Sequence, residues 1–257
     1  MNKKYIDQLL NQYPKTRSLL PKKIRDIYAL HYQKNRDGKT PITSIAQKME
    51  RWLHKMVAKD LTSTLNQSTA NQIDTLEIGA GSLNQLPYEP QSRAYDIVEP
   101  FTDLYRNNPD IKKVRNIYQD ITEIPEHYRY DRITTIATLE HIINLPYVIA
   151  KSAIHLKQGG GFRVAIPNEG TILWHLGWKL TTGIEFRLKY GVDYSLLMKH
   201  EHINTSKEII SLLKHFFHDC QIKYFGLTPY FAFYLFINCK KPNYENCQSY
   251  LTKKTIC

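Results

Sequence analysis

The stretch from Ile73 to Ser82 constrains the fold more than any other part of the chain. Its apolar run stops abruptly at Gly79, and a second glycine follows at Gly81. Glycine has no Cβ, so the backbone can turn tightly there and approach a ligand closely. A buried strand that runs into such a turn is typical of open α/β sheets, which bind nucleotides beyond the carboxyl ends of their strands. An ordinary strand and turn without a ligand is the alternative interpretation.

The residues around the two glycines distinguish between cofactors. A dinucleotide-binding fingerprint has a third glycine at the position that Asn84 occupies here. This chain instead has an acid, Glu77, two residues before the first glycine. The pattern Glu-x-Gly-x-Gly, with Ala80 between the glycines, resembles the first motif of the class I S-adenosylmethionine-dependent methyltransferases. That family usually has another glycine where this chain has Leu83. The resemblance implies that Glu77 and residues 79–81 belong to a cofactor site.

From residue 73 onward, strand-like runs alternate with helical patterns. This alternation predicts an α/β fold with a mostly parallel sheet and helices on both faces. Together with the resemblance, it indicates a Rossmann-like sheet of seven strands, the last two joined as a hairpin. A helix over 148–156 is expected to end at the glycines 159–161 as a C-cap, and Thr205 to Glu208 form a capping box. The predicted strands are 73–78, 95–99, 113–118, 131–137, 161–166, 219–225 and 231–238.

Two acids that follow later strands fit the same cofactor site. Glu99 ends the second predicted strand, where a carboxylate can accept hydrogen bonds from both ribose hydroxyls. Asp120 follows the third strand. In the methyltransferase family an acid at this position typically meets the adenine amino group, and the next residue, here Ile121, lines the ring. Each acid taken alone is also explained as a surface carboxylate at the end of a strand.

The fourth predicted strand ends in Thr138-Leu139-Glu140-His141-Ile142. This segment resembles the Leu-Glu-His segment of the methyltransferase branch that modifies small molecules and sugars, and by that resemblance Thr138 and Leu139 border the methyl donor. The run Leu156-Lys157-Gln158-Gly159-Gly160 is similar to the family's turn before its fifth strand. The resemblance covers roughly residues 73–240, and it implies S-adenosyl-L-methionine as the cofactor.

Three histidines are candidates for the base that removes a proton from a hydroxyl acceptor. His141 follows the fourth strand, whereas His200 and His202 lie directly before the capped helix. A histidine suits this role because its reference pKa lies close to neutrality. Each could also be a hydrogen-bonding residue that orients a loop. His200-x-His202 could hold a metal, but no clear carboxylate–histidine framework surrounds it in the sequence, so no metal is expected.

Residues 1–70 are expected to form an N-terminal helical cap, which packs on the main domain or closes over the substrate. A helix is clearest over 44–64, where apolar residues recur at helical spacing. The segment carries 14 Lys and Arg against 5 Asp and Glu, a net of +9 out of +11 for the whole chain. Such a charge suggests an acidic partner, for example phosphate or nucleic acid, although a solvated helical surface explains it equally.

The main domain is expected to span 71–240, with an insertion at 168–200 and a C-terminal tail at 241–257. The insertion is rich in aromatic and basic residues, which predicts either a wall for a sugar phosphate, lipid-linked sugar or nucleotide, or plain packing on the sheet. The aromatic members are Trp174, His175, Trp178, Phe186, Tyr190 and Tyr194, and the basic ones are Lys179, Arg187 and Lys189.

The sequence therefore predicts a methyltransferase that acts on a small-molecule or carbohydrate-type acceptor, possibly phosphate-bearing, most simply by O-methylation. An RNA methyltransferase and a non-catalytic cofactor-binding protein of the same fold are the alternatives. No apolar run is long enough for a signal peptide or a transmembrane helix, so a cytoplasmic location is expected. The four cysteines show no Cys-x-x-Cys spacing, so neither zinc nor a redox pair is indicated. Nothing in the sequence indicates the oligomeric state.

Overall fold

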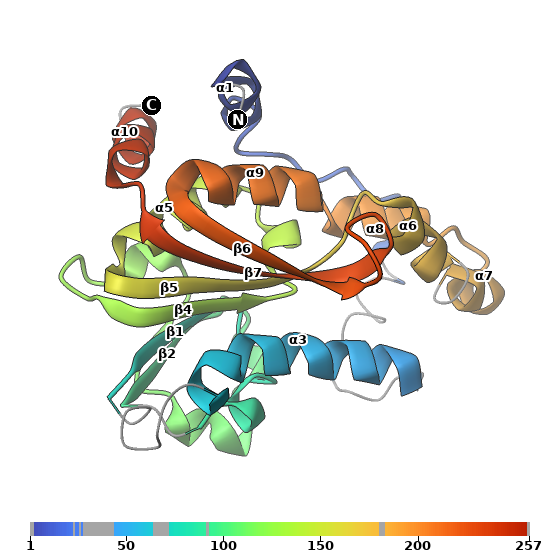
Figure 1. The fold of residues 1–257 in the computed structure, drawn as a ribbon. Coiled ribbons are helices and arrows are strands. Elements are labelled where there is room, and N and C mark those ends of the chain that lie inside the picture. Colours follow the sequence, from blue (N-terminus) through green and yellow to red (C-terminus); the bar gives the residue numbers. More distant parts are fainter. Residues whose placement is uncertain are drawn as a thin grey trace.

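The computed structural model describes residues 3–22, 24, 25, 27, 44–63, 72–90, 93–179 and 183–255. These residues form a seven-stranded sheet with helices on both faces (Figure 1). The strands are β1 (Asp74–Ile78), β2 (Ala94–Val98), β3 (Ile117–Tyr118), β4 (Tyr130–Ile136), β5 (Leu156–Pro167), β6 (Phe217–Gly226) and β7 (Ala232–Pro242).

The order of strands across the sheet is β3-β2-β1-β4-β5-β7-β6. The five strands from β3 to β5 are parallel to their neighbours, and β7 lies antiparallel between β5 and β6. The chain steps outward from β1 to β3 and then returns to the other side of β1 with β4. Ligands bind at such a reversal, beyond the carboxyl ends of the strands. The predicted α/β class, the mostly parallel sheet and the closing hairpin are confirmed.

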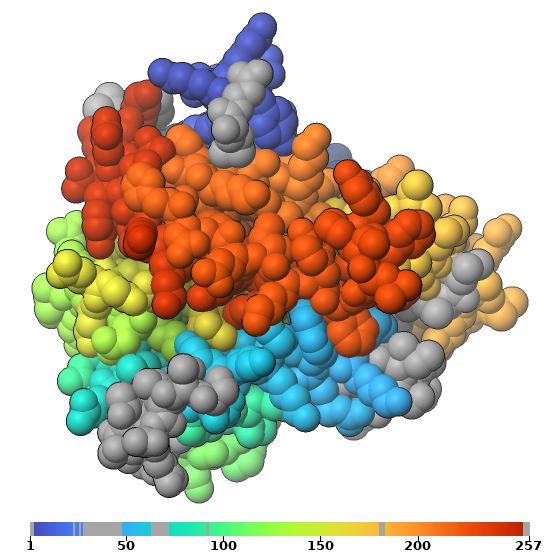
Figure 2. Space-filling view, viewed as in Figure 1, coloured from blue at the N-terminus to red at the C-terminus, as the bar shows by residue number. Residues whose placement is uncertain are grey.

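Helices cover the two faces of the sheet differently. The helix α3 (Ser44–Ser63) lies below the sheet in Figure 1 and contacts β4, β5 and β7. Above the sheet, α5 (Leu145–Ile154) contacts β5 and α9 (Ser206–Phe216) contacts β6, while α1 (Lys3–Leu10) and α10 (Tyr244–Thr255) pack on this layer. Figure 2 shows the blue surface of α3 directly against the orange-red surface of the β6–β7 hairpin.

Two arginines of the sheet fix the second half of α3 in place. Arg163 donates to the backbone carbonyls of Met56 and Val57, at 2.7 Å each. Arg132 donates to the carboxylate of Asp60 at 2.9 Å. Charge-assisted bonds of this kind are stronger than neutral ones, so this part of the N-terminal region is anchored to the sheet. Residues 28–43 and 64–71, which contain the rest of the predicted cap and its linker, lie outside the described residues.

Two predicted boundaries are wrong. The third strand, predicted over 113–118, consists only of Ile117–Tyr118, because the short helix η3 (Pro109–Lys113) occupies the chain before it. The glycines 159–161 do not cap a helix, because α5 ends at Ile154 and β5 already begins at Leu156. Gly159 takes a left-handed φ of +80°, which glycine adopts at little cost. A Cβ on Gly160 would lie 2.9 Å from the carbonyl oxygen of Asp131. The glycines therefore allow the start of β5 to pass close to the start of β4.

The expected insertion contains three short helices, α6 (Ile172–Trp178), α7 (Ile184–Tyr190) and α8 (Ser195–Glu201). Phe186 is buried with Leu20 and Leu197, and Tyr190 and Tyr194 pack against them. These three aromatic residues are therefore part of a local core. No helix within the described ranges is both long and apolar enough to cross a lipid bilayer.

Two cysteines that are distant in sequence face each other across the β6–β7 hairpin. Cys220 and Cys239 are register partners, and their sulfur atoms are 2.6 Å apart. Both are free thiols. The spacing of the cysteines along the chain does not reveal this neighbourhood, since the register of the hairpin creates it.

Candidate active site

The glycine turn after β1 has the backbone that the sequence predicts for a close approach to a ligand. Gly79 and Gly81 both have positive φ, +72° and +52°, which is unfavourable for residues with a Cβ. A Cβ on Gly79 would lie 2.3 Å from the side chain of Thr138, which follows β4. The turn is thus pressed against the end of β4, at the reversal point of the sheet.

Glu99 lies beside this turn, directly after β2. Its side chain is buried, and its two oxygens each accept one backbone hydrogen bond, from Gly81 at 2.8 Å and from Phe101 at 3.0 Å. A carboxylate has about four acceptor positions, so Glu99 keeps the capacity to accept two further donors. Neighbouring hydroxyls of a ribose are donors of this kind.

Glu77 occupies a different environment from Glu99. It lies within β1, and its buried carboxylate accepts a hydrogen bond from the hydroxyl of Tyr95 at 2.7 Å. Burial raises the pKa of the Glu77 carboxyl to about 8, because the charged form loses its hydration. Ala80, between the two glycines, is buried as well.

The other residues predicted for the cofactor follow β3 and β4. Asp120 accepts two hydrogen bonds from Thr122 through one oxygen, and it is exposed. Ile121 is buried beside it. Thr138 donates to the carbonyl of Ile136 at 2.9 Å, and Leu139 is fully buried. All these positions come directly after parallel strands, whose carboxyl ends share one edge of the sheet.

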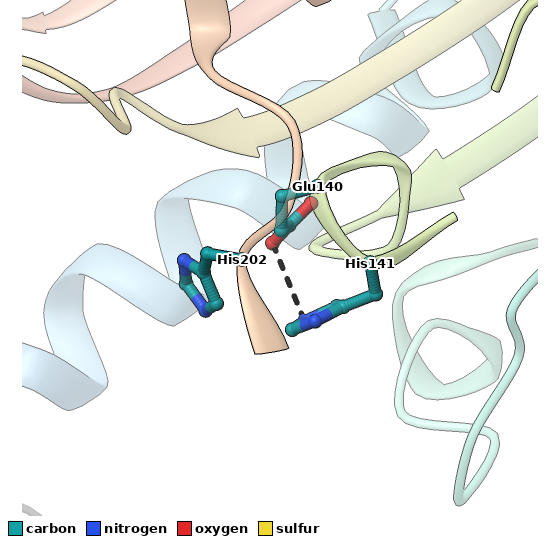
Figure 3. Close-up of side chains that lie close together, drawn as sticks. All are labelled: Glu140, His141 and His202. Carbon is teal, nitrogen blue, oxygen red and sulfur yellow. Dashed lines mark ion pairs between the residues drawn. The ribbon is translucent and has the colours of Figure 1, made fainter. Parts of the chain in front are cut away.

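Glu140, His141 and His202 come together at this edge as a cluster, which we call the Glu-His-His cluster (Figure 3). Glu140 and His141 belong to a short turn of helix, η5 (Leu139–His141), and His202 caps the end of α8. One potential ligand atom from each residue lies within 4.8 Å of the others. The two predicted histidines are thus brought together with a carboxylate that the prediction did not include.

Polar partners hold both imidazole rings. Nδ1 of His202 donates to the carboxylate of Glu169 at 2.7 Å, and the indole of Trp174 donates to the same oxygen. Nδ1 of His141 donates to the backbone carbonyl of Glu201 at 2.9 Å. Since these partners only accept, they assign the proton of each neutral ring to Nδ1 and the lone pair to Nε2. Glu169 supplies the carboxylate partner that the sequence did not reveal.

One oxygen of the Glu140 carboxylate lacks a hydrogen-bond partner of this kind. Glu140 is 1% exposed, and its Oε2 has no hydrogen-bond partner among the described residues. Its Oε1 lies 3.8 Å from Nε2 of His141. Burial raises the pKa of the Glu140 carboxyl to about 6, although the neighbouring His141 opposes the shift.

Residues 13–17, here called the N-terminal strap, hold the loop that carries His202. The hydroxyl of Tyr13 donates to Asn204 at 2.8 Å, and Lys15 donates to the carbonyl of Ile203 at 2.8 Å. Arg17 donates to Glu201 at 2.9 Å and to the carbonyl of His141 at 3.1 Å. Nothing in the sequence pattern connects these residues, because they lie more than 120 positions apart.

A cavity of about 570 Å³ lies beside the strap and has His202 in its wall. Its volume falls within the range of small-molecule sites. Lys199 adds a positive charge to its lining, Lys15 is also in the wall but pairs with Glu208 at 2.7 Å, and Leu19 and Leu196 add apolar surface. His200, the third predicted histidine, is not in this wall, and its Nδ1 bonds to the carbonyl of Ser18 at 2.7 Å.

Comparison with known proteins finds solved structures that are similar to this chain, although the searches by sequence give no match. No family model matches the chain, and no curated sequence matches it. The plantazolicin methyltransferase BpumL in complex with SAH aligns with a TM-score of 0.60 at 14% identity, over 92% of this chain and 99% of that chain. Magnesium protoporphyrin IX methyltransferase (ChlM) from Synechocystis PCC 6803 with bound SAH has a TM-score of 0.53 at 12% identity, over 84% and 98%.

A third structure, an S-adenosylmethionine-dependent methyltransferase from Clostridium acetobutylicum ATCC 824, has a TM-score of 0.51 at 15% identity, over 85% of this chain and 99% of that chain. These identities are too low to transfer a substrate, but the alignments span nearly the whole of each known chain. The protein therefore has the Rossmann-like fold of the S-adenosylmethionine-dependent methyltransferases.

Proposed function

We propose that the protein transfers a methyl group from S-adenosyl-L-methionine to a small-molecule or carbohydrate-type acceptor. The observation that carries this proposal is the buried Glu99 carboxylate, which accepts the Gly81 N–H at the glycine turn, where a Cβ on Gly79 would clash with Thr138. A carboxylate at this position can accept hydrogen bonds from a ribose diol. The SAH bound in BpumL and ChlM supports the same cofactor.

The cofactor contacts follow from the positions around this edge. Glu99 binds the ribose hydroxyls, Asp120 the adenine amino group, and Ile121 the face of the ring. Residues 79–81, Thr138 and Leu139 border the donor, while Glu77 supports the turn from inside the sheet through its bond to Tyr95. When bound, the cofactor supplies a methyl group on a positively charged sulfur.

The Glu-His-His cluster activates the acceptor, which we assign as a hydroxyl. Nε2 of His202 takes the hydroxyl proton, because Glu169 holds the opposite nitrogen and thereby orients the ring. His141 offers a second Nε2 in the same place. The basic cavity beside His202 suits a small polar acceptor that carries negative charge, such as a phosphate-bearing sugar.

Calorimetry with the purified full chain tests the cofactor. We expect S-adenosylmethionine and its demethylated product to bind, and NAD to bind much more weakly. Tighter binding of NAD would overturn the proposal. Incubation with radiolabelled cofactor and fractionated extract, followed by nuclease, protease and glycosidase, then identifies the acceptor. Label released by nuclease alone would indicate an RNA methyltransferase instead.

A further inference from the structure

The Glu-His-His cluster has the composition of a metal site. Two imidazole nitrogens and one carboxylate oxygen lie within 4.8 Å of one another, contributed by η5 and by the end of α8. We propose that Glu140, His141 and His202 bind a divalent first-row transition-metal cation. The use of this cation in methyl transfer rests on the proposed function, but its binding does not.

The partners of the two rings support ligation. Metal-binding histidines almost always donate their other ring N–H to a carboxylate or a backbone carbonyl, which fixes the ring and raises its basicity. His202 donates to the Glu169 carboxylate, and His141 donates to the Glu201 carbonyl. Both rings thus present the Nε2 lone pair that a cation needs. The Trp174 indole holds Glu169 in turn.

The Glu140 carboxylate supplies a second, independent observation. A buried carboxylate oxygen without a hydrogen-bond donor is costly, because it has lost its hydration. Oε2 of Glu140 is such an oxygen among the described residues, whereas its other oxygen, Oε1, is the one that faces the His141 ring, 3.8 Å from Nε2 (Figure 3). A bound cation would compensate for the lost hydration.

The kind of cation follows from the donors. Two imidazoles and one carboxylate suit Mn²⁺, Fe²⁺, Co²⁺ or Zn²⁺ better than Mg²⁺ or Ca²⁺, which prefer oxygen ligands. Donors bound at about 2.1 Å from a cation lie about 3–3.5 Å apart. The widest spacing in the cluster, up to 4.8 Å, therefore needs to contract by about 1.3–1.8 Å when a cation binds. Three protein ligands leave open coordination positions, as catalytic sites do.

In the proposed reaction the cation would take over the role of the base. With Nε2 of His202 engaged as a ligand and no longer free to accept a proton, the cation would lower the pKa of an acceptor hydroxyl, and the proton would leave to water. The acceptor oxygen then attacks the methyl carbon, the carbon–sulfur bond breaks, and its electron pair remains on the sulfur. The products are the methyl ether, the neutral demethylated cofactor and one proton.

Cobalt(II) titration of the metal-free, untagged full chain tests the site, followed by visible absorption and calorimetry. We expect one equivalent to bind and to produce a ligand-field spectrum. His141→Ala and His202→Ala should each weaken binding at least about 100-fold. Glu169→Gln, which acts through His202, should weaken it about 10- to 100-fold. His218→Ala, at an exposed histidine on β6, is the matched control and should change nothing.

Circular dichroism and binding of the demethylated cofactor verify that each variant folds. Absence of cobalt binding at millimolar concentration, or equal binding by native protein and both histidine variants, would overturn the metal site. Cofactor binding without metal binding would leave the proposed function intact. Metal binding without cofactor binding would retain the site and reject the function.

Discussion

Glu99 joins the glycine turn to the loop after β2 through two backbone hydrogen bonds. A hydrogen bond to a charged group contributes about 1.5–3 kcal/mol. We therefore expect Glu99→Ala to weaken binding of the demethylated cofactor about 10- to 100-fold in calorimetry. Asp103→Ala removes a nearby exposed carboxylate and serves as the control. Equal affinity of Glu99→Ala and native protein would mean that Glu99 only fixes the loop.

The raised pKa of Glu77 predicts that the stability of the protein depends on pH. The folded protein holds a proton on Glu77 up to about pH 8, whereas the unfolded chain releases it near 4.5. Between pH 4.5 and 8, the folded protein therefore keeps a proton that the unfolded chain has released. The contribution of Glu77 to the free energy of unfolding is greatest below pH 4.5 and is lost as the pH rises toward 8. Glu77→Gln cannot ionise and can still accept the Tyr95 hydrogen bond.

We expect Glu77→Gln to match the native protein near pH 4.5 and to exceed its free energy of unfolding increasingly up to pH 8. The difference should reach a few kcal/mol, since one pKa unit corresponds to about 1.4 kcal/mol. Urea denaturation over this pH series measures it. A constant difference between the two proteins across the series would contradict the raised pKa.

At the scale of elements, the N-terminal strap positions the loop between α8 and α9. Arg17→Ala removes the bonds to Glu201 and to the His141 carbonyl. We expect turnover to fall about 10- to 100-fold, in line with the loss of about 1.5–3 kcal/mol. Affinity for the cofactor should not change, because the hydrogen bonds of Arg17 to described residues go to Glu201 and His141, on the Glu-His-His side of the site.

Lys22→Ala is the control for this variant, since Lys22 is an exposed cation of the same N-terminal region. Steady-state rates and cofactor calorimetry, measured side by side, separate the two effects. If Lys22→Ala lowered turnover by a similar factor, the loss of positive charge in this region would explain the effect, and the positioning of the loop by Arg17 would not.

The elements also show what sequence could predict. Alternating apolar patterns located the strands of the sheet, since burial imposes those patterns. In the sequence, the glycines 159–161 indicate a helix end, because the same residue type serves both a C-cap and the close approach of two strands. The motif residues Glu99, Asp120 and Thr138 could be placed because each directly follows a strand. Arg17 and Glu169 act through tertiary contacts, which leave no local pattern.

At the scale of the whole molecule, Arg132 connects α3 to the sheet. Its side chain is 3% exposed and pairs with Glu89, which is 2% exposed, at 2.7 Å, and with Asp60 at 2.9 Å. Removal of one partner from a buried ion pair costs about 3–5 kcal/mol, because the remaining charge stays buried. We expect Arg132→Ala to lose that much free energy of unfolding in urea denaturation.

Arg132→Met keeps apolar volume at the same position and should lose less. Arg129→Ala, at an exposed arginine nearby, is the control and should change stability by less than about 0.5 kcal/mol. If Arg132→Ala were as stable as the control, Arg132 would not anchor α3.

The topology of the sheet explains why only part of the candidate site could be predicted from the sequence. His141 and His202 are distant along the chain, yet the backbone N–H groups of Ile203 and Asn204 both donate to the carbonyl of Glu140. This return of the chain to η5 depends on the strand order, which motifs do not encode. The same holds for Cys220 and Cys239, which only the hairpin register brings together.

The contacts of the N-terminal strap also determine when the site can be assembled during protein synthesis. Lys15 and its acceptor Ile203 are 188 residues apart, and ribosomes add about 5–20 residues per second. The strap is therefore made roughly 10–40 s before its partners leave the ribosome. The glycine turn and Glu99 are translated much earlier than His202. The backbone of the glycine turn and of the loop that carries Glu99 is thus made well before the chain contains the complete Glu-His-His cluster.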